Sequence, residues 1–162
     1  MPFRVNRFSR AIWVVIAAGI FVADQVTKAL VEALIPEHAT VPVIPHFLNL
    51  DHTTNPGAVF GLFSDSPSPL KTVLLIVVSS LLLALVIGLM WRSQHLGRVG
   101  GVGLALILGG ALSNLFDRIR VGRVVDFLDV YYRGYHWYTF NLADASIVVG
   151  AGFLVFELLF RD

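Results

Sequence analysis

The amino-acid sequence predicts an all-α membrane protein with four transmembrane helices. Hydrophobic residues make up 56% of the 162-residue chain and charged residues only 14%, against about 25% charged residues in soluble proteins. The mean hydropathy is +0.76. A bilayer core about 30 Å thick requires about 20 mostly apolar residues per helix. Four stretches meet this requirement, at 11–34, 70–91, 99–117 and 142–160, and we expect a single membrane domain over residues 1–162.

The first span is expected to be retained as a transmembrane helix. Arg4, Arg7 and Arg10 precede it as in a signal peptide, but it is too long for such a segment and has no small-residue cleavage site near its end. Four spans place both termini on one side, and the arginines next to the first span place that side in the cytoplasm. The connection between the third and fourth spans disagrees with this orientation, because it contains Arg118, Arg120, Arg123 and Arg133.

The segments on the extracytoplasmic side are predicted to contain short structured elements. Residues 39–50 alternate apolar residues with prolines, which indicates short extended (β) structure at the membrane surface. Asn55-Pro56-Gly57 is a turn signal. Residues 58–63 are predicted to form a short interfacial helix, and its segment from Phe60 to Phe63 could act as a lid over the site. The aromatic residues of 131–138 are expected at the same level.

The third span is predicted to pack closely against its neighbours. It is rich in small residues that let helix backbones approach each other, namely Gly100, Gly101, Gly103, Gly109, Gly110, Ala111 and Ser113.

A group of polar residues in or beside the apolar spans maps to one end of those spans, the extracytoplasmic end. An ionisable side chain at the centre of a membrane helix costs roughly 2.5–3.5 kcal/mol by insertion scales, so such residues are retained where they are paired, hydrated or functional. Their clustering indicates a functional site that includes Asp24, Lys28, Asn114, Asp117, Arg118, Asn141 and Asp144.

Asp126 and Asp144 are the candidate reacting pair. Asp126 follows the third span, Asp144 lies about one turn into the fourth, and the 18-residue connection can fold back to bring them together. Two neighbouring carboxyl groups in an apolar site share one proton. The ionised acid can then activate a water while the protonated acid polarises a peptide carbonyl, which is peptide hydrolysis without a metal or a covalent intermediate.

Each of these residues also has a purely structural interpretation. Asp144 could complement the dipole of the fourth helix, and Asp126 could cap a turn or pair with Arg123. Asp24 and Lys28, four residues apart, are interpreted as a structural ion pair. Asn55 could be only a turn residue, Arg118 an interfacial anchor, and Asn114 and Asn141 partners in hydrogen bonds between helices. Asp117 and Asp129 are interpreted as structural acids.

The composition gives no indication of a cofactor, a metal or a nucleic-acid partner. The chain has no cysteine, its five histidines lie apart without ligand spacing, and no glycine-rich phosphate loop is present. Two other functions remain open on residue chemistry alone. One is a proton-coupled transporter, although no internal repeat is visible, and the other is a noncatalytic assembly or lipid-binding protein.

Five strings in the sequence resemble the lipoprotein signal peptidase (signal peptidase II) family of bacteria. They are DQVTK at 24–28, NPGAVFG at 55–61, GGALSNLFDR at 109–118, VVDFLD at 124–129 and FNLADASI at 140–147. The resemblance covers nearly the full chain. It implies an aspartic endopeptidase of the bacterial inner membrane that removes the signal peptide of a diacylglyceryl-modified prolipoprotein just before the lipidated cysteine.

The resemblance also implies roles for individual residues. Asp126 and Asp144 match the catalytic aspartates of the family at the extracytoplasmic face. Asp24 and Lys28 would support the first helix, Asn55, Asn114 and Asn141 would line the site, and Arg118 would bind the acids or the substrate backbone. The implied partners are the prolipoprotein, which would enter laterally, membrane lipid, and peptide antibiotics as inhibitors.

Overall fold

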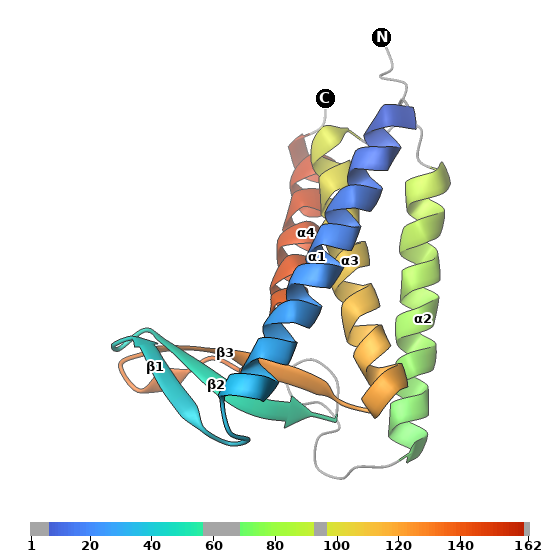
Figure 1. Ribbon diagram of the computed structural model, residues 1–162. Helices are drawn as coiled ribbons and strands as arrows, with labels where there is room; N and C mark the ends of the chain where they lie inside the picture. Colours follow the sequence, from blue (N-terminus) through green and yellow to red (C-terminus); the bar gives the residue numbers. More distant parts are fainter. Residues whose placement is uncertain (1–6, 57–68, 93–96, 161–162) are drawn as a thin grey trace.

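Four long helices form a bundle from which a small sheet projects at one end (Figure 1). The computed structural model describes residues 7–56, 69–92 and 97–160. The helices are α1 (Arg7–Leu34), α2 (Pro69–Arg92), α3 (Arg98–Val121) and α4 (Leu142–Phe160). All four are long and apolar enough to cross a membrane, which confirms the predicted spans. The interfacial helix and lid predicted at 58–63 lie outside the described residues.

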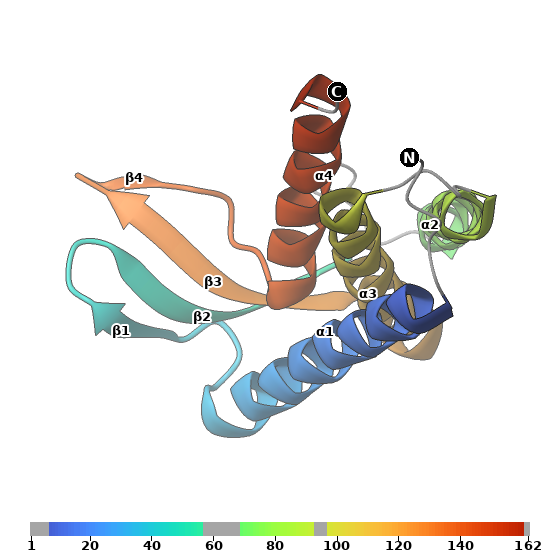
Figure 2. The same cartoon turned by 90° about the horizontal axis from the view of Figure 1, so that it is seen from above.

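Helix α3 is the central helix of the bundle and contacts each of the other three (Figure 2). Its small residues allow this, as the sequence predicted. Gly103 and Gly150 meet where α3 crosses α4, and a Cβ atom added to Gly103 would lie 2.7 Å from the Gly150 carbonyl oxygen. On the α1 side, a Cβ added to Gly109 would lie 2.5 Å from the carbonyl oxygen of Ala17. The backbones of α1 and α4 therefore lie against α3 without intervening side chains at these points.

Both ends of α3 are fixed by hydrogen bonds. At its first turn, the Glu157 carboxylate of α4 accepts from the backbone N–H of Gly97, at 2.6 Å, and of Gly100, at 2.5 Å. At the other end, Gly122 adopts a left-handed conformation (φ 75°), and its N–H donates to the Arg118 carbonyl. The helix thus ends at Val121, one turn beyond the predicted limit of 117. The apolar stretch ends at that limit, but backbone hydrogen bonding continues through the polar last turn.

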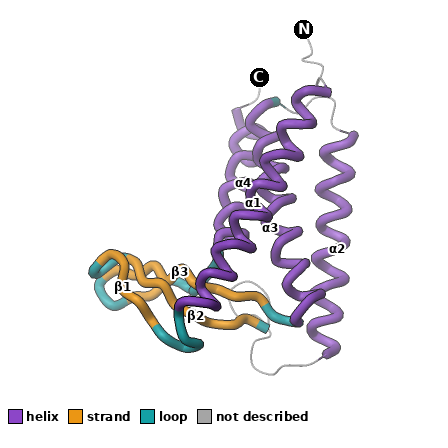
Figure 3. Tube along the Cα trace, in the orientation of Figure 1, coloured by secondary structure: helices purple, strands orange, loops and turns teal. Residues whose placement is uncertain are grey.

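The sheet lies at the end of the bundle opposite the start of α1 and projects away from α2 (Figures 1 and 3). Its antiparallel strands follow the order β1-β2-β3-β4, and they are β1 (Thr40–Ile44), β2 (Leu48–Asn55), β3 (Val124–Tyr132) and β4 (Tyr135–His136). Extended structure was predicted at 39–50 and is present there. Strands β3 and β4 were not predicted.

Strand β3 joins the sheet to the bundle. Val125 and Phe127 from β3 pack with Val31 and Ile35 at the end of α1 in a buried apolar cluster. Neighbouring strand β2 is in register with it, so that Thr53 lies opposite Asp126. Asp126 is thereby held at the junction of sheet and helices.

Candidate active site

Asn141 contacts both candidate acids. Asp126, near the start of β3, is 2% exposed, and Asn141, directly before α4, is fully buried. The Asn141 side-chain amide donates to Asp126 Oδ1 at 2.7 Å. Its carbonyl oxygen accepts from the backbone N–H of Asp144 at 2.9 Å. The structure therefore brings the acids from β3 and α4 to one buried asparagine.

Two further asparagines each hold one of the acids. Asn114 of α3 donates from Nδ2 to Asp144 Oδ1 at 2.8 Å, and its Oδ1 accepts from Asn141 Nδ2 at 3.2 Å. Asn55, the last residue of β2, donates from Nδ2 to Asp126 Oδ2 at 2.9 Å. Both oxygens of Asp126 thus accept a hydrogen bond from an asparagine side chain.

Asp144 also occupies the N-terminal turn of α4 in the way its structural interpretation predicted. The backbone N–H of Asn141 approaches Asp144 Oδ2 at 3.4 Å, while the Asn141 side chain accepts from the Asp144 N–H. This reciprocal arrangement is a capping box. The same contacts that start α4 also fix the position of the Asp144 carboxyl group.

The buried ammonium group of Lys28 orients the side chain of Asn114. Lys28 Nζ lies 2.6 Å from Asp24 Oδ2, 2.6 Å from Asp117 Oδ2 and 2.9 Å from Asn114 Oδ1. These three contacts match the three hydrogens of an ammonium group. Because Lys28 contacts the carbonyl oxygen of Asn114, the amide nitrogen faces Asp144. The predicted Asp24–Lys28 ion pair is confirmed.

Asp24 extends this network to the start of α4. Its Oδ1 accepts from the backbone N–H of Ala143 at 2.9 Å, and its Oδ2 accepts from the Ser113 hydroxyl at 2.7 Å. Helices α1, α3 and α4 are therefore joined by polar contacts immediately beside Asp144.

The remaining predicted residue, Arg118, borders the same cluster. Its guanidinium donates from Nη1 to the backbone carbonyl of Asn114 at 3.2 Å. The alternative pairing of Asp126 with Arg123 is not formed among the residues that the structure describes. Within that part of the chain, no group of three His, Asp or Glu side chains is placed to hold a metal ion.

The pKa of Asp126 is raised to about 7, first by burial and then by the charge of the neighbouring Asp144. The hydrogen bonds from Asn55 and Asn141 and the charge of Lys28 act against this shift but do not cancel it. Asp126 therefore exchanges its proton near neutral pH, which suits an acid or a base in catalysis.

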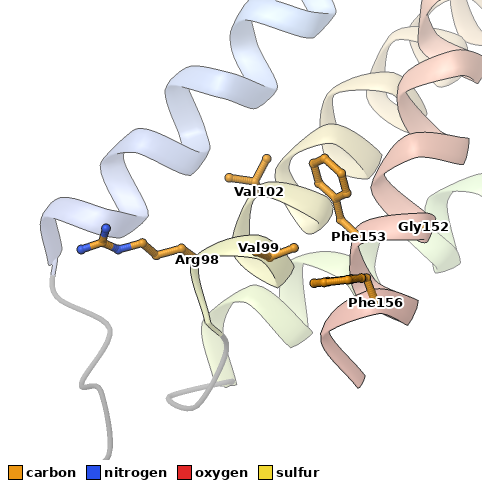
Figure 4. Close-up of a pocket in the computed structure, with 6 residues that line it drawn as sticks. All are labelled: Arg98, Val99, Val102, Gly152, Phe153 and Phe156. Carbon is orange, nitrogen blue, oxygen red and sulfur yellow. The ribbon is translucent and has the colours of Figure 1, made fainter. Parts of the chain in front are cut away.

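A cavity of about 430 Å³ opens beside Asp126 on the side of the sheet. Its walls include Thr53 and Thr54 of β2, His136 of β4, and Trp137 and Tyr138 of the following segment. A larger cavity, of about 600 Å³, lies between α3 and α4 at the opposite end of the bundle. Figure 4 shows its lining residues, which are apolar except for Arg98, whose guanidinium points away from the two phenylalanine rings. It is lined by no carboxyl group, so of these two cavities the one beside Asp126 combines space with reactive side chains.

The sequence predicted Asn55 and Asp126 of the sheet as site residues but missed the rest of the cavity wall. It identified neither Thr53 and Thr54 nor His136 as neighbours of Asp126. The pairing of Thr53 and Thr54 with β3 joins segments about 70 residues apart, which periodicity does not reveal, and the position of His136 depends on the pairing of β3 with β4. The only local signal was His136-Trp137 in an aromatic segment after two acids.

Known proteins resemble the chain over most of its length. The family model described as Signal peptidase (SPase) II matches residues 16–160. A lipoprotein signal peptidase of Solibacter usitatus (strain Ellin6076) is 46% identical over 144 residues, which cover 89% of this chain and 88% of that protein. Another, of Desulforapulum autotrophicum, is 43% identical over 142 residues, which cover 88% of each chain.

Solved structures agree with these sequence matches. A bacterial membrane enzyme determined by the in meso method at 1.9 Å resolution superposes with a TM-score of 0.82 at 30% identity. The match covers 94% of this chain and 95% of that one. The sequence matches, the four apolar helices and this shared fold show that the chain belongs to the signal peptidase II family of membrane peptidases.

Proposed function

We propose that this protein removes the signal peptide from diacylglyceryl-modified bacterial prolipoproteins, cleaving just before the lipidated cysteine with Asp126 and Asp144 as its catalytic residues. The observation that carries the assignment of the acids is their joint attachment to Asn141, deep at the junction of β3 and α4. The relatives are named lipoprotein signal peptidase, which supports the substrate class.

The two acids divide the chemistry between them. Asp126, with a pKa of about 7, carries the shared proton and polarises the scissile carbonyl. Asp144, at the positive end of the α4 dipole, acts as a carboxylate and takes a proton from the attacking water. The resulting tetrahedral diol collapses when a proton passes to the amide nitrogen of the cysteine. The C–N bond then breaks, giving a signal-peptide acid and a lipidated N-terminal amine.

The supporting residues hold this pair in place. Asn55, Asn114 and Asn141 donate to the carboxyl oxygens, Lys28 and Asp24 fix Asn114 and the start of α4, and Arg118 borders the pair and contributes positive charge for substrate or acid binding. The proposed setting is the bacterial inner membrane, with both termini in the cytoplasm and the acids at the extracytoplasmic face. Membrane lipid holds the diacyl chains of the substrate beside the helices.

Cleavage of a synthetic diacylglyceryl prolipopeptide by the purified protein in detergent tests this proposal. Asp126→Asn and Asp144→Asn should each lower kcat by about 100- to 10,000-fold, because each acid acts in one protonation state. Glu32→Gln, which changes an exposed acid on α1, is the matched control and should retain the native rate. Near-native turnover by either aspartate variant, with an unchanged unfolding temperature at pH 5, would refute the assignment of the two acids.

A further inference from the structure

A second polar cluster borders the cavity beside Asp126 and has no part in the proposed reaction. His136 lines this cavity together with Asp126. Its ring nitrogen Nδ1 lies 2.8 Å from Asp129 Oδ1 and 3.0 Å from Asp129 Oδ2. Asp129 is only 4% exposed and also accepts from Asn49 Nδ2 at 2.8 Å. Because a carboxylate only accepts hydrogen bonds, Nδ1 is the protonated nitrogen of the ring.

A stacking contact also fixes the orientation of the imidazole ring of His136. The Tyr131 ring stacks on His136 with centroids 4.8 Å apart and planes 7° from parallel. Tyr131 is itself held, because its hydroxyl accepts from the backbone N–H of His46 at 2.8 Å. The two stacked residues are paired across β3 and β4. The sheet thus presents His136 in one orientation.

The other ring nitrogen, Nε2, is available for a ligand. Among the described residues nothing bonds to it, and the His136 side chain is 52% exposed where it borders the cavity. When the imidazole is neutral, Nε2 accepts a hydrogen bond, and when it is charged, Nε2 donates one. It can therefore accept a hydrogen bond from a peptide N–H when the ring is neutral and donate one to a peptide carbonyl when the ring is charged.

The cavity itself suits a polypeptide main chain. Its lining includes hydroxyl-bearing residues, Thr53, Thr54 and Thr139, and the aromatic residues Trp137 and Tyr138. The cavity lies on the sheet side of Asp126, whereas we expect the apolar signal segment to lie along the helices. The segment expected to reach the cavity is therefore the polar one after the cleaved bond, which leaves the membrane.

We infer that His136 is a substrate-binding residue whose Nε2 bonds the main chain of the polypeptide that follows the lipidated cysteine. This inference rests on the proposed function and adds a specificity element to it. Asp129, Asn49 and Tyr131 are positioning residues that act through His136. The enzyme then recognises the first residues of the mature lipoprotein as well as its signal peptide and lipid.

Two substrates separate this inference from the proposed function. Both are diacylglyceryl prolipopeptides with the same signal segment. The short one ends one residue after the lipidated cysteine, and the long one continues for six more. The native protein should have the higher kcat/KM for the long substrate. His136→Asn retains a donor for Asp129 but lacks Nε2, so it should lower kcat/KM for the long substrate by about 3- to 10-fold and leave the short one unchanged.

Two further variants distinguish substrate binding from a structural role. His136→Gln can place an amide near the position of Nε2 and should recover part of the preference for the long substrate. His38→Asn changes an exposed histidine between α1 and β1 whose positive φ suits asparagine, and it should behave as the native protein.

The outcomes have different meanings. An unchanged ratio of long to short kcat/KM in His136→Asn, or an equal loss on both substrates, would overturn the role of His136 while the proposed function stands. Failure of the native protein to cleave either substrate would overturn the proposed function and this inference with it.

Discussion

The environment of Asp126 has two opposite effects on the ionisation of its carboxyl group. Its carboxyl group is buried between the sheet and the bundle, where a charge is poorly solvated, yet both oxygens accept amide hydrogen bonds that suit a carboxylate. The two effects oppose each other, and burial dominates. The result is a group that changes protonation near neutral pH, which an ordinary surface aspartate does not do.

The burial of Asp126 predicts a pH dependence of stability. In the unfolded chain the group loses its proton near pH 3.8, whereas the folded protein retains it up to a pKa of about 7. The stabilisation of the folded state that comes from this raised pKa is therefore fully present below pH 3.8 and is lost as the pH rises through about 7. Between pH 5 and pH 8 the loss is on the order of 2 kcal/mol.

Thermal unfolding in detergent at pH 5 and pH 8 measures this effect. The unfolding temperature of the native protein should fall more between the two pH values than that of Asp126→Asn, which has no proton to lose at this position. The comparison uses the pH difference within each protein, so any constant cost of the substitution cancels. An equal fall in both proteins would show that Asp126 titrates normally.

At the scale of single residues, the sequence predicted which residues form the site better than it predicted the contacts that join them across the sheet. Asp24 and Lys28 could be paired because helix geometry places residues four apart on one face. The contact of Asn55 with Asp126 joins residues 71 positions apart, and that of Asn49 with Asp129 depends on the register of β2 and β3. No local pattern contains such information.

Among the elements, α3 determines how the site is assembled, because it contacts both α1 and α4 through small residues. Gly110 lies where the first turn of α4 crosses α3, beside Asp144. A Cβ atom added there would lie 2.5 Å from the Ser146 hydroxyl oxygen and would also meet the Ala143 carbonyl. The spacing between these two helices is therefore set by the absence of one methyl group.

Gly110→Ala should displace the start of α4 and with it Asp144. We expect kcat to fall at least about tenfold, since small misplacements of catalytic groups have large kinetic effects, and the unfolding temperature to fall as well. Gly152→Ala is the matched control on α4, because its added methyl group would meet nothing within 4 Å. Activity and unfolding temperature of Gly110→Ala that equal those of the control would contradict this account of the helix contact.

Elements differed in how well the sequence predicted them. The four helices follow from hydropathy, because each span needs about 20 apolar residues. Strand β3 was interpreted as a loop because it is buried over most of its length and so lacks the alternation typical of a half-exposed strand, while its two acids suggest a polar connection. Residues 39–50 were predicted correctly because their prolines and alternating apolar residues are typical of edge strands.

At the scale of the whole molecule, the candidate active site and the two termini of the helix bundle lie on opposite sides. The acids and the sheet are at one end, and the start of α1 and the end of α4 are at the other (Figure 1). If the membrane surrounds the four helices, the two ends face different compartments. The arginines near the start of α1 favour the cytoplasm for that end.

Single cysteines test this orientation, because the native chain has none. Tyr135→Cys introduces a thiol in the exposed part of β4, and Arg92→Cys introduces one at the end of α2. In spheroplasts, a membrane-impermeant maleimide should label Tyr135→Cys, whereas Arg92→Cys should react only after lysis. The reverse pattern would place the acids in the cytoplasm.

The contacts of Glu157 have a mechanical consequence for α3 and α4. This carboxylate ties the end of α4 to the first turn of α3, while Asn114 and Asp144 tie the same two helices at the far end. Sliding one helix by a single residue, a rise of about 1.5 Å, would break both attachments at once. The two helices are therefore fixed in their axial positions relative to each other, so under the proposed function any adjustment to different lipoproteins falls to the sheet rather than to these helices.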